Sequence, residues 1–203
     1  MNRKEDLLKK YCKGKTVLDV GCAGGPNPPI GFMHEKIASV AMSCIGIDAD
    51  PIKIQQMANM CFDVHCANAE DFRVKNQSFD IVIATELIEH LNNVSDFLYC
   101  ARRHMGKDTL LIISTPNLYA FNPIKQHILG YDKHRDNYLD NHSVVFTPST
   151  MGEILRRHDL IIRELYYTCE ATNLRGKIFS WLIPDIFHDS MLFIIKRKEA
   201  NDV

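Results

Sequence analysis

The segment VLDVGCAGG, from Val17 to Gly25, constrains the fold of this chain more than any other. It predicts a buried strand from Thr16 to Val20 that runs directly into a glycine-rich turn. Gly21, Gly24 and Gly25 have no Cβ, so the backbone can bend sharply there and a ligand can approach the peptide groups closely. The segment therefore predicts a turn that holds a small molecule by its backbone.

The rest of the chain alternates between apolar strands and helical segments, and no break in composition requires a second domain. Further strands are expected at 44–48, 63–67, 79–85, 109–115, 160–168 and 191–198. Helices are expected near the N-terminus, after a proline-rich loop within 26–42, and at 51–58, 87–98 and 148–159. This alternation predicts an α/β fold with a parallel, doubly wound sheet in a single domain over residues 1–203. The periodicity fails at about 116–147, where we expect a lid or a substrate wall.

The composition excludes several classes of protein. With 203 residues, 46% of them hydrophobic, the chain can bury one sizeable core, and a formal net charge of -1 gives no basic field for long DNA. No apolar stretch has the length of a signal peptide or a transmembrane segment, so we expect a cytoplasmic protein. The seven cysteines include no C-x-x-C pair, which argues against a disulfide framework or a thiolate zinc site.

The residues around the glycine turn favour one kind of ligand. Asp19 would repel a pyrophosphate, but its carboxylate suits the amino group of an amino-acid-like cofactor. The spacing G-x-x-G-G also differs from the dinucleotide pattern G-x-G-x-x-G. The segment resembles motif I of the class I S-adenosylmethionine (SAM) dependent methyltransferases.

The resemblance extends over most of the chain from Val17 to Leu160. It rests on six segments in family order: LDVGCAGG, GIDAD, NAEDF, FDIVIATELIEHL, LLIISTPN and FTPSTMGEILRRHDL. Among class I methyltransferases the chain is most similar to the branch of the ubiquinone-biosynthesis O-methyltransferases and of many glycan-modifying relatives. The resemblance implies SAM as the cofactor and a Rossmann-like fold whose sheet is mostly parallel, with an antiparallel C-terminal edge strand.

The same resemblance implies which residues hold the cofactor. They are Asp19 at the amino group, Gly21 and Gly24 in the turn, Asp48 at the ribose hydroxyls, Asn68 and Ala69 at the adenine, and Thr85 at the end of the 79–85 strand. The alternative for Asp48 is a helix N-cap, a role for which Asp50 is better placed. Ile52 and Phe72 could enclose the adenine ring, but we expect both in the core.

The segment from Glu86 to His90 allows two interpretations, a metal site or a solvated turn. On a continuous helix Glu86, Glu89, His90 and Asn93 would share one stripe. The two carboxylates and the imidazole on this stripe could bind Mg²⁺ or Mn²⁺, and His142 could add a fourth ligand. Small-RNA 2′-O-methyltransferases carry a similar E-x-x-E-H segment. The alternative is a solvated first turn in which Glu86 contacts the methionine end of the cofactor through its backbone.

The candidate catalytic residues are His142 and Glu86. An imidazole with a pKa near neutrality could remove the acceptor's hydroxyl proton, and His142 directly precedes the block that ends the predicted lid. We predict methyl transfer to an oxygen of a small polyhydroxylated, glycan or phenolic acceptor. The alternatives are a metal-assisted RNA 2′-O-methyltransferase, a non-catalytic SAM-binding regulator and, against the glycine spacing, a nicotinamide-dependent oxidoreductase.

The apolar stretch within residues 173–190 has several possible roles. It could form a homodimer contact or touch a lipid-linked substrate or a membrane surface, but a covering element for the sheet is the favoured interpretation.

Overall fold

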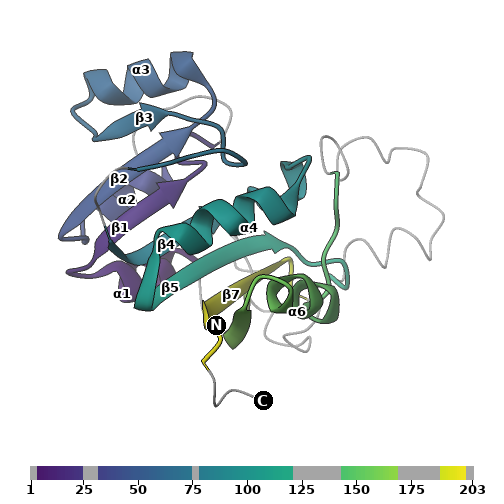
Figure 1. Cartoon of the computed structure of the whole chain (residues 1–203). Coiled ribbons are helices and arrows are strands. Elements are labelled where there is room, and N and C mark those ends of the chain that lie inside the picture. The colour runs from purple at the N-terminus through teal and green to yellow at the C-terminus, as the bar shows by residue number, and fades with distance from the viewer. Residues whose placement is uncertain (1–3, 25–31, 75–77, 121–142, 169–187, 200–203) are drawn as a thin grey trace, which may run out of the picture.

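A computed structural model describes residues 4–24, 32–74, 78–120, 143–168 and 188–199. Within these residues, seven strands form one sheet in the order β3-β2-β1-β4-β5-β7-β6 (Figure 1). The strands are β1 (Thr16–Val20), β2 (Ser43–Asp48), β3 (Val64–Cys66), β4 (Phe79–Thr85), β5 (Met105–Pro116), β6 (Leu160–Thr168) and β7 (Ser190–Arg197). The predicted α/β sheet is confirmed, and strands β1 to β5 are parallel.

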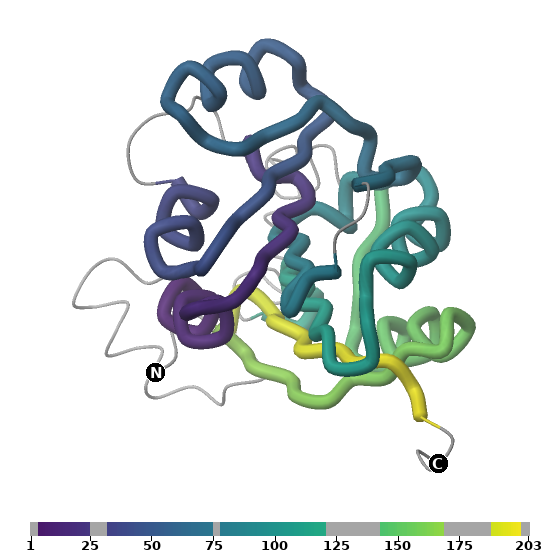
Figure 2. The backbone as a smooth tube through the Cα atoms, turned by 60° about the vertical axis from the view of Figure 1, so that its left-hand side comes forward, coloured from purple at the N-terminus to yellow at the C-terminus, as the bar shows by residue number. Residues whose placement is uncertain are grey.

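Helices cover both faces of the sheet (Figure 2). They are α1 (Lys4–Cys12), α2 (Met33–Ala38), α3 (Pro51–Asn59), the 3₁₀ turn η1 (Ile88–His90), α4 (Val94–Arg103) and α6 (Pro148–Arg156). The buried side chains of α1 and α2 pack on one face, and those of α4 and α6 pack on the other. None of the helices in the described ranges is both long and apolar enough to span a membrane.

Side-chain alternation along the central strands explains this double packing. In β1, Leu18 and Val20 belong to the core beneath α4 and α6, whereas Val17 belongs to the core beneath α1 and α2. In β4, Val82 and Ala84 face the first core and the neighbouring isoleucines face the second. Strands buried on both faces are apolar at nearly every position, which is why these segments were recognisable as parallel strands from the sequence.

The C-terminal strand is antiparallel to both of its neighbours, as predicted, but it lies one position in from the edge. Six consecutive residues of β7, beginning at Ser190, are buried, whereas most residues of β6 are half-buried. The more apolar strand therefore occupies the inner position, and β6 forms the edge.

The predicted helix over 87–98 is wrong in its first half. Glu86 adopts a left-handed backbone conformation with φ of 47°, and only a short 3₁₀ turn follows it. The side chain of Asn93 accepts hydrogen bonds from the N–H groups of Ser95 and Asp96, so Asn93 is the N-cap at which α4 begins. The polar residue that was expected to extend a helical stripe instead starts a new helix.

The two ends of the predicted lid lie side by side. Asn117 forms an isolated parallel bridge with Phe146, and the N–H of Asn117 donates to the carbonyl of Asp189 at 2.9 Å. Thr147 then caps α6, which begins at Pro148 as predicted. Residues 121–142 of the lid lie outside the described residues.

Candidate active site

The predicted cofactor residues follow strands that are neighbours in the sheet. The order β3-β2-β1-β4 places the ends of these parallel strands along one edge, and the chain order reverses between β1 and β4. Open α/β sheets bind ligands beyond the carboxyl ends of their strands at such a reversal. The structure thus brings together at one edge the glycine turn, Asp48, Asn68 and Thr85.

The glycine turn is fixed by its backbone and by Leu87. The N–H groups of Gly21 and Cys22 both donate to the carbonyl of Ile47, at 2.8 and 3.1 Å. Gly21 has φ of 79°, and a Cβ on it would lie 3.0 Å from Cδ1 of Leu87. Gly24 is exposed at the far side of the turn. Gly21 is therefore required for both conformation and close packing, whereas Gly24 is exposed and its N–H donates to the carbonyl of Gly21 at 3.3 Å.

Asp48 ties the end of β2 to this turn. Its Oδ2 accepts a hydrogen bond from the N–H of Ala23 at 3.0 Å, and its Oδ1 accepts from the N–H of Asp50 at 2.9 Å. Asp50 is the N-cap of α3, since its side chain accepts from the N–H groups of Ile52 and Lys53. Capping therefore falls to Asp50, and Asp48 is held at the strand end beside the turn.

The segment after β3 differs from expectation in one respect. Asn68 is exposed and its Oδ1 accepts from the N–H of Glu70 at 2.9 Å, while Ala69 is buried. Phe72 is buried as predicted and stacks on His104, with ring centroids 4.9 Å apart. The expectation that Ile52 lies in the core is wrong, because it is 70% exposed at the start of α3. Burial of Phe72 leaves Ile52 as the apolar side chain available near Asp48.

A histidine that the sequence analysis did not single out is the partner of Asp19. Nδ1 of His34, on α2, lies 2.9 Å from Oδ2 of Asp19, and both side chains are buried. A carboxylate oxygen can only accept a hydrogen bond, so with Asp19 as a carboxylate Nδ1 of His34 is the donor. The chain has nine histidines, and only the fold shows that this one reaches the strand end.

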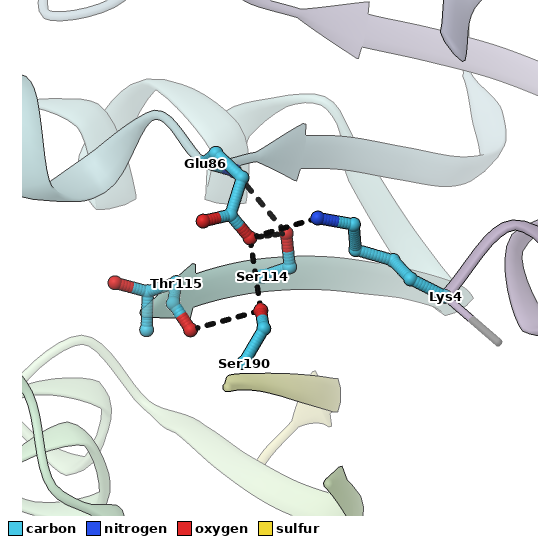
Figure 3. A network of polar contacts seen from close by, with 5 residues as sticks. All are labelled: Lys4, Glu86, Ser114, Thr115 and Ser190. Carbon is cyan, nitrogen blue, oxygen red and sulfur yellow. Dashed lines mark hydrogen bonds and ion pairs between the residues drawn. The ribbon is translucent and has the colours of Figure 1, made fainter. Parts of the chain in front are cut away.

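Glu86 is the centre of a polar network at the end of β4 (Figure 3). Its Oε1 accepts hydrogen bonds from Ser114 at 2.7 Å, Ser190 at 3.0 Å and Lys4 at 3.2 Å. The backbone N–H of Glu86 also donates to the carbonyl of Ser114 at 3.0 Å. Figure 3 shows the second carboxylate oxygen pointing away from the three donors. The network joins α1, β4, β5 and β7 around one carboxylate.

Glu89 is in the opposite situation. It is 1% exposed, and neither carboxylate oxygen has a hydrogen-bond partner within the part of the chain that the structure describes. Burial and the negative charge of Glu86 raise the pKa of the Glu89 carboxyl to about 7. The carbonyl of Glu89 accepts from the N–H of Ser143 at 2.7 Å, so this residue also anchors the end of the lid.

The metal-ligand stripe predicted from the sequence is not formed in the structure. Glu89 is buried while His90 is exposed, because the segment is a 3₁₀ turn rather than the first turn of a long helix. Over the described ranges, no group of three or more His, Cys, Asp or Glu side chains is arranged to hold a metal ion. The fourth candidate ligand and candidate base, His142, lies outside the described residues.

Sequence comparison gives a consistent set of relatives. Residues 2–165 match the family model described as "Methyltransferase domain". The chain is 31% identical over 111 residues to the ubiquinone biosynthesis O-methyltransferase of Azorhizobium caulinodans, covering 52% of this chain and 42% of that protein. It is 30% identical over 161 residues to the enzyme of the same name from Rickettsia typhi, covering 73% of this chain and 61% of that protein. The chain thus spans less than half of the first relative.

Structural comparison agrees on the fold. A SAM-dependent methyltransferase from Clostridium acetobutylicum superimposes with a TM-score of 0.67 at 11% identity, covering 98% of this chain and 93% of that chain. At this identity the likeness concerns the fold alone.

Proposed function

Because the chain belongs to the methyltransferase domain family and has the class I SAM-dependent methyltransferase fold, we propose that it transfers a methyl group from SAM to an oxygen of a small acceptor. The acceptor class is polyhydroxylated, glycan or phenolic. The relatives named as ubiquinone biosynthesis O-methyltransferases support oxygen as the target atom. The observation that carries the proposal is the meeting of the glycine turn, Asp48 and Thr85 at adjacent strand ends.

In this proposal each cofactor residue contacts a different part of SAM. The glycine turn lets the ligand approach the backbone closely, Asp19 serves the amino group, and Asp48 serves the ribose hydroxyls. Asn68 and the backbone of Ala69 contact the adenine edge. The exposed side chain of Ile52 packs on the adenine ring, in keeping with its 70% exposure.

The methyl-transfer step asks little more of the protein than position and a proton acceptor. Bound SAM supplies a methyl group on positively charged sulfur, and the acceptor oxygen gains that methyl as its proton leaves. His142 is the proposed acceptor of this proton. Glu86, held by three donors at the end of β4, fixes the geometry of the chain beside the reacting groups.

Glu89 supports a second version of the same activity, in which a divalent cation assists. A buried carboxylate without a partner costs free energy, and a cation, a proton or an acceptor hydroxyl would relieve that cost. Mg²⁺ and Mn²⁺ prefer carboxylate oxygens, and metal-assisted RNA 2′-O-methylation remains the alternative that uses them. The described residues do not complete a ligand set for such an ion.

The decisive experiment is a calorimetric titration with S-adenosylhomocysteine (SAH), followed by methyl-transfer assays. We expect SAH binding, competition by SAM and no competition by NADH, and we expect labelled methyl groups to appear on catechol, polyol or glycan acceptors. Absence of SAH binding overturns the proposal. Tight SAH binding without methyl transfer to any acceptor favours a SAM-binding regulator. Methyl transfer only to RNA 2′-hydroxyls, with loss of this activity in EDTA, favours the metal-assisted alternative.

The cellular location and assembly belong to the same proposal. We propose a cytoplasmic enzyme, and a homodimer contact through 173–190 remains a prediction because residues 173–187 lie outside the described residues.

A further inference from the structure

The buried pair of His34 and Asp19 is the feature that the proposed mechanism leaves unused. Nδ1 of His34 is 2.9 Å from Oδ2 of Asp19, and the two side chains are 0% and 4% exposed. Nε2 of His34 is buried without a hydrogen-bond partner in the described portion of the chain. The ring therefore hydrogen-bonds through Nδ1, which is directed at the carboxylate, and Phe62 packs edge-on against it.

The neighbouring strand is shaped to admit this ring. Gly46 of β2 lies opposite Asp19 of β1 in the parallel register. A Cβ on Gly46 would lie 2.8 Å from Cε1 of His34 and 2.7 Å from Sγ of Cys22, closer than side-chain carbons approach other atoms. The absent side chain at Gly46 is what leaves room for the imidazole beside Asp19.

Three thiols of the described residues lie close enough to Asp19 for its charge to act on them. Burial, reinforced by the charge of Asp19, raises the pKa of the Cys12 thiol to about 12, and it raises the pKa of Cys22 and Cys44 further still. These thiols remain neutral at physiological pH. Among the described residues, the N–H of His34 is the donor that compensates the buried carboxylate.

We infer that His34 is a positioning residue of the cofactor site, which holds the Asp19 carboxylate at the end of β1 in the orientation that receives the amino group of the methionine part of SAM. The inference rests on the proposed function. Asp19 lies two residues before Gly21, so a carboxylate that is free to rotate would lose its alignment with the turn. One fixed oxygen leaves the carboxylate plane defined for its ligand.

The test compares two ligands that differ only in the part that Asp19 would contact. SAH carries the amino acid portion, whereas 5′-methylthioadenosine carries the adenosine and sulfur without it. In His34→Leu we expect SAH affinity to fall about tenfold or more, the loss of one charge-assisted hydrogen bond, while methylthioadenosine affinity changes less than about twofold. His34→Asn keeps an amide N–H at the position of Nδ1 and is expected to retain SAH affinity within about threefold.

Three outcomes are decisive. A fall for SAH alone in His34→Leu, with rescue by His34→Asn, supports the positioning role, whereas an equal fall for both ligands or no fall for either overturns it. If His34→Leu does not fold, His34→Gln replaces it, because its amide reaches the position of Nε2 and leaves Asp19 without its donor. Wild-type protein that binds neither ligand refutes the proposed function itself, which is a different result from any of these.

Discussion

The end of β1 and the end of β4 each bury a carboxylate, and the two are treated differently by the fold. Asp19 is 3% exposed and is bonded to His34, whereas Glu89 is 1% exposed and has no partner for either oxygen among the described residues. Burying a charge is unfavourable unless a partner compensates it. The carboxylate of Asp19 is thus compensated within the fold, whereas that of Glu89 needs a proton, a cation or an acceptor.

The difference has a functional meaning under the proposed activity. A cofactor site that is preformed binds the same molecule in every turnover, so a fixed arrangement at β1 and β2 is advantageous. The acceptor side has to exchange a proton, and a carboxyl with a pKa of about 7 can change its charge at physiological pH. Substitutions at the cofactor side and at the acceptor side can test this difference separately.

The largest effect is expected from Asp48→Ala, which tests whether the first region is indeed the cofactor site. The variant loses the bond from Ala23 at 3.0 Å together with the proposed ribose contact. SAH affinity should fall at least about a hundredfold, or roughly 3 kcal/mol, as measured by calorimetry.

Asp50→Ala is the matched control, because it removes a carboxylate two residues away that only caps α3. It should lower the free energy of unfolding by about 1 kcal/mol and leave SAH affinity unchanged. Equal binding by Asp48→Ala and wild type would remove the ribose assignment.

Glu89→Gln tests the second region through the dependence of stability on pH. The pKa of Glu89 is about 7 in the fold against an ordinary value of 4.5, so the favourable contribution is complete below pH 4.5 and is lost as the pH rises through 7. Between pH 4.5 and pH 8 the wild-type free energy of unfolding should fall relative to that of Glu89→Gln by about 3 kcal/mol. Urea unfolding in EDTA at several pH values measures this difference.

Glu153→Gln provides the comparison for this effect. Glu153 lies on α6, and its arginine neighbours lower the pKa of its carboxyl. A lowered pKa contributes stability above the ordinary value and loses it only in acid, so this variant should parallel wild type between pH 5 and pH 8. Parallel curves for Glu89→Gln as well would show that Glu89 is compensated by something outside the described residues.

The first region was largely predictable from the sequence, and the second was not. The glycine turn directly follows β1, and Asp48 is the last residue of β2. Both strands are largely buried, so the local pattern and the fold agree. After β4 the spacing of apolar residues matches a helix from 87 to 98, but Asn93 competes by accepting backbone hydrogen bonds and starts α4 late. Helical periodicity does not reveal which polar residue becomes a cap.

The partners of the site residues were the least predictable part. His34 reaches Asp19 only because Gly46 is its neighbour across the sheet, and Lys4 reaches Glu86 over a separation of 82 residues. Such contacts depend on the placement of α1 and α2 on the sheet, which no local spacing records. Strand ends were thus identified correctly, whereas the side chains that hold them were not.

Gly46→Ala tests whether the first region depends on the space beside Asp19. The new methyl group would lie within 2.9 Å of His34 and Cys22 atoms, so the ring has to shift. We expect a loss of about 1 to 2 kcal/mol in the free energy of unfolding and about a tenfold loss of SAH affinity. Full SAH affinity in a destabilised variant would separate packing from positioning.

Gly152→Ala is the control for this substitution. Gly152 lies within α6, and its added Cβ would meet its nearest atom, Cδ1 of Ile162, at 3.8 Å. Since alanine favours the helix, stability should rise by up to about 1 kcal/mol with no change in SAH affinity.

The smallest effect is expected from Lys4→Met. Lys4 interacts with both carboxylates after β4, those of Glu86 and Glu89. Lys4 is buried against Glu86, so its loss should cost about 1 kcal/mol, whereas Lys9→Met, which breaks a half-exposed pair with Glu5, should cost less than about 0.5 kcal/mol. Lys4 also lowers the pKa of Glu89, in opposition to Glu86. In Lys4→Met the pH-dependent loss of stability that Glu89 causes should therefore occur at a higher pH than in wild type. An unchanged midpoint of this loss would show that the charge of Lys4 does not affect Glu89.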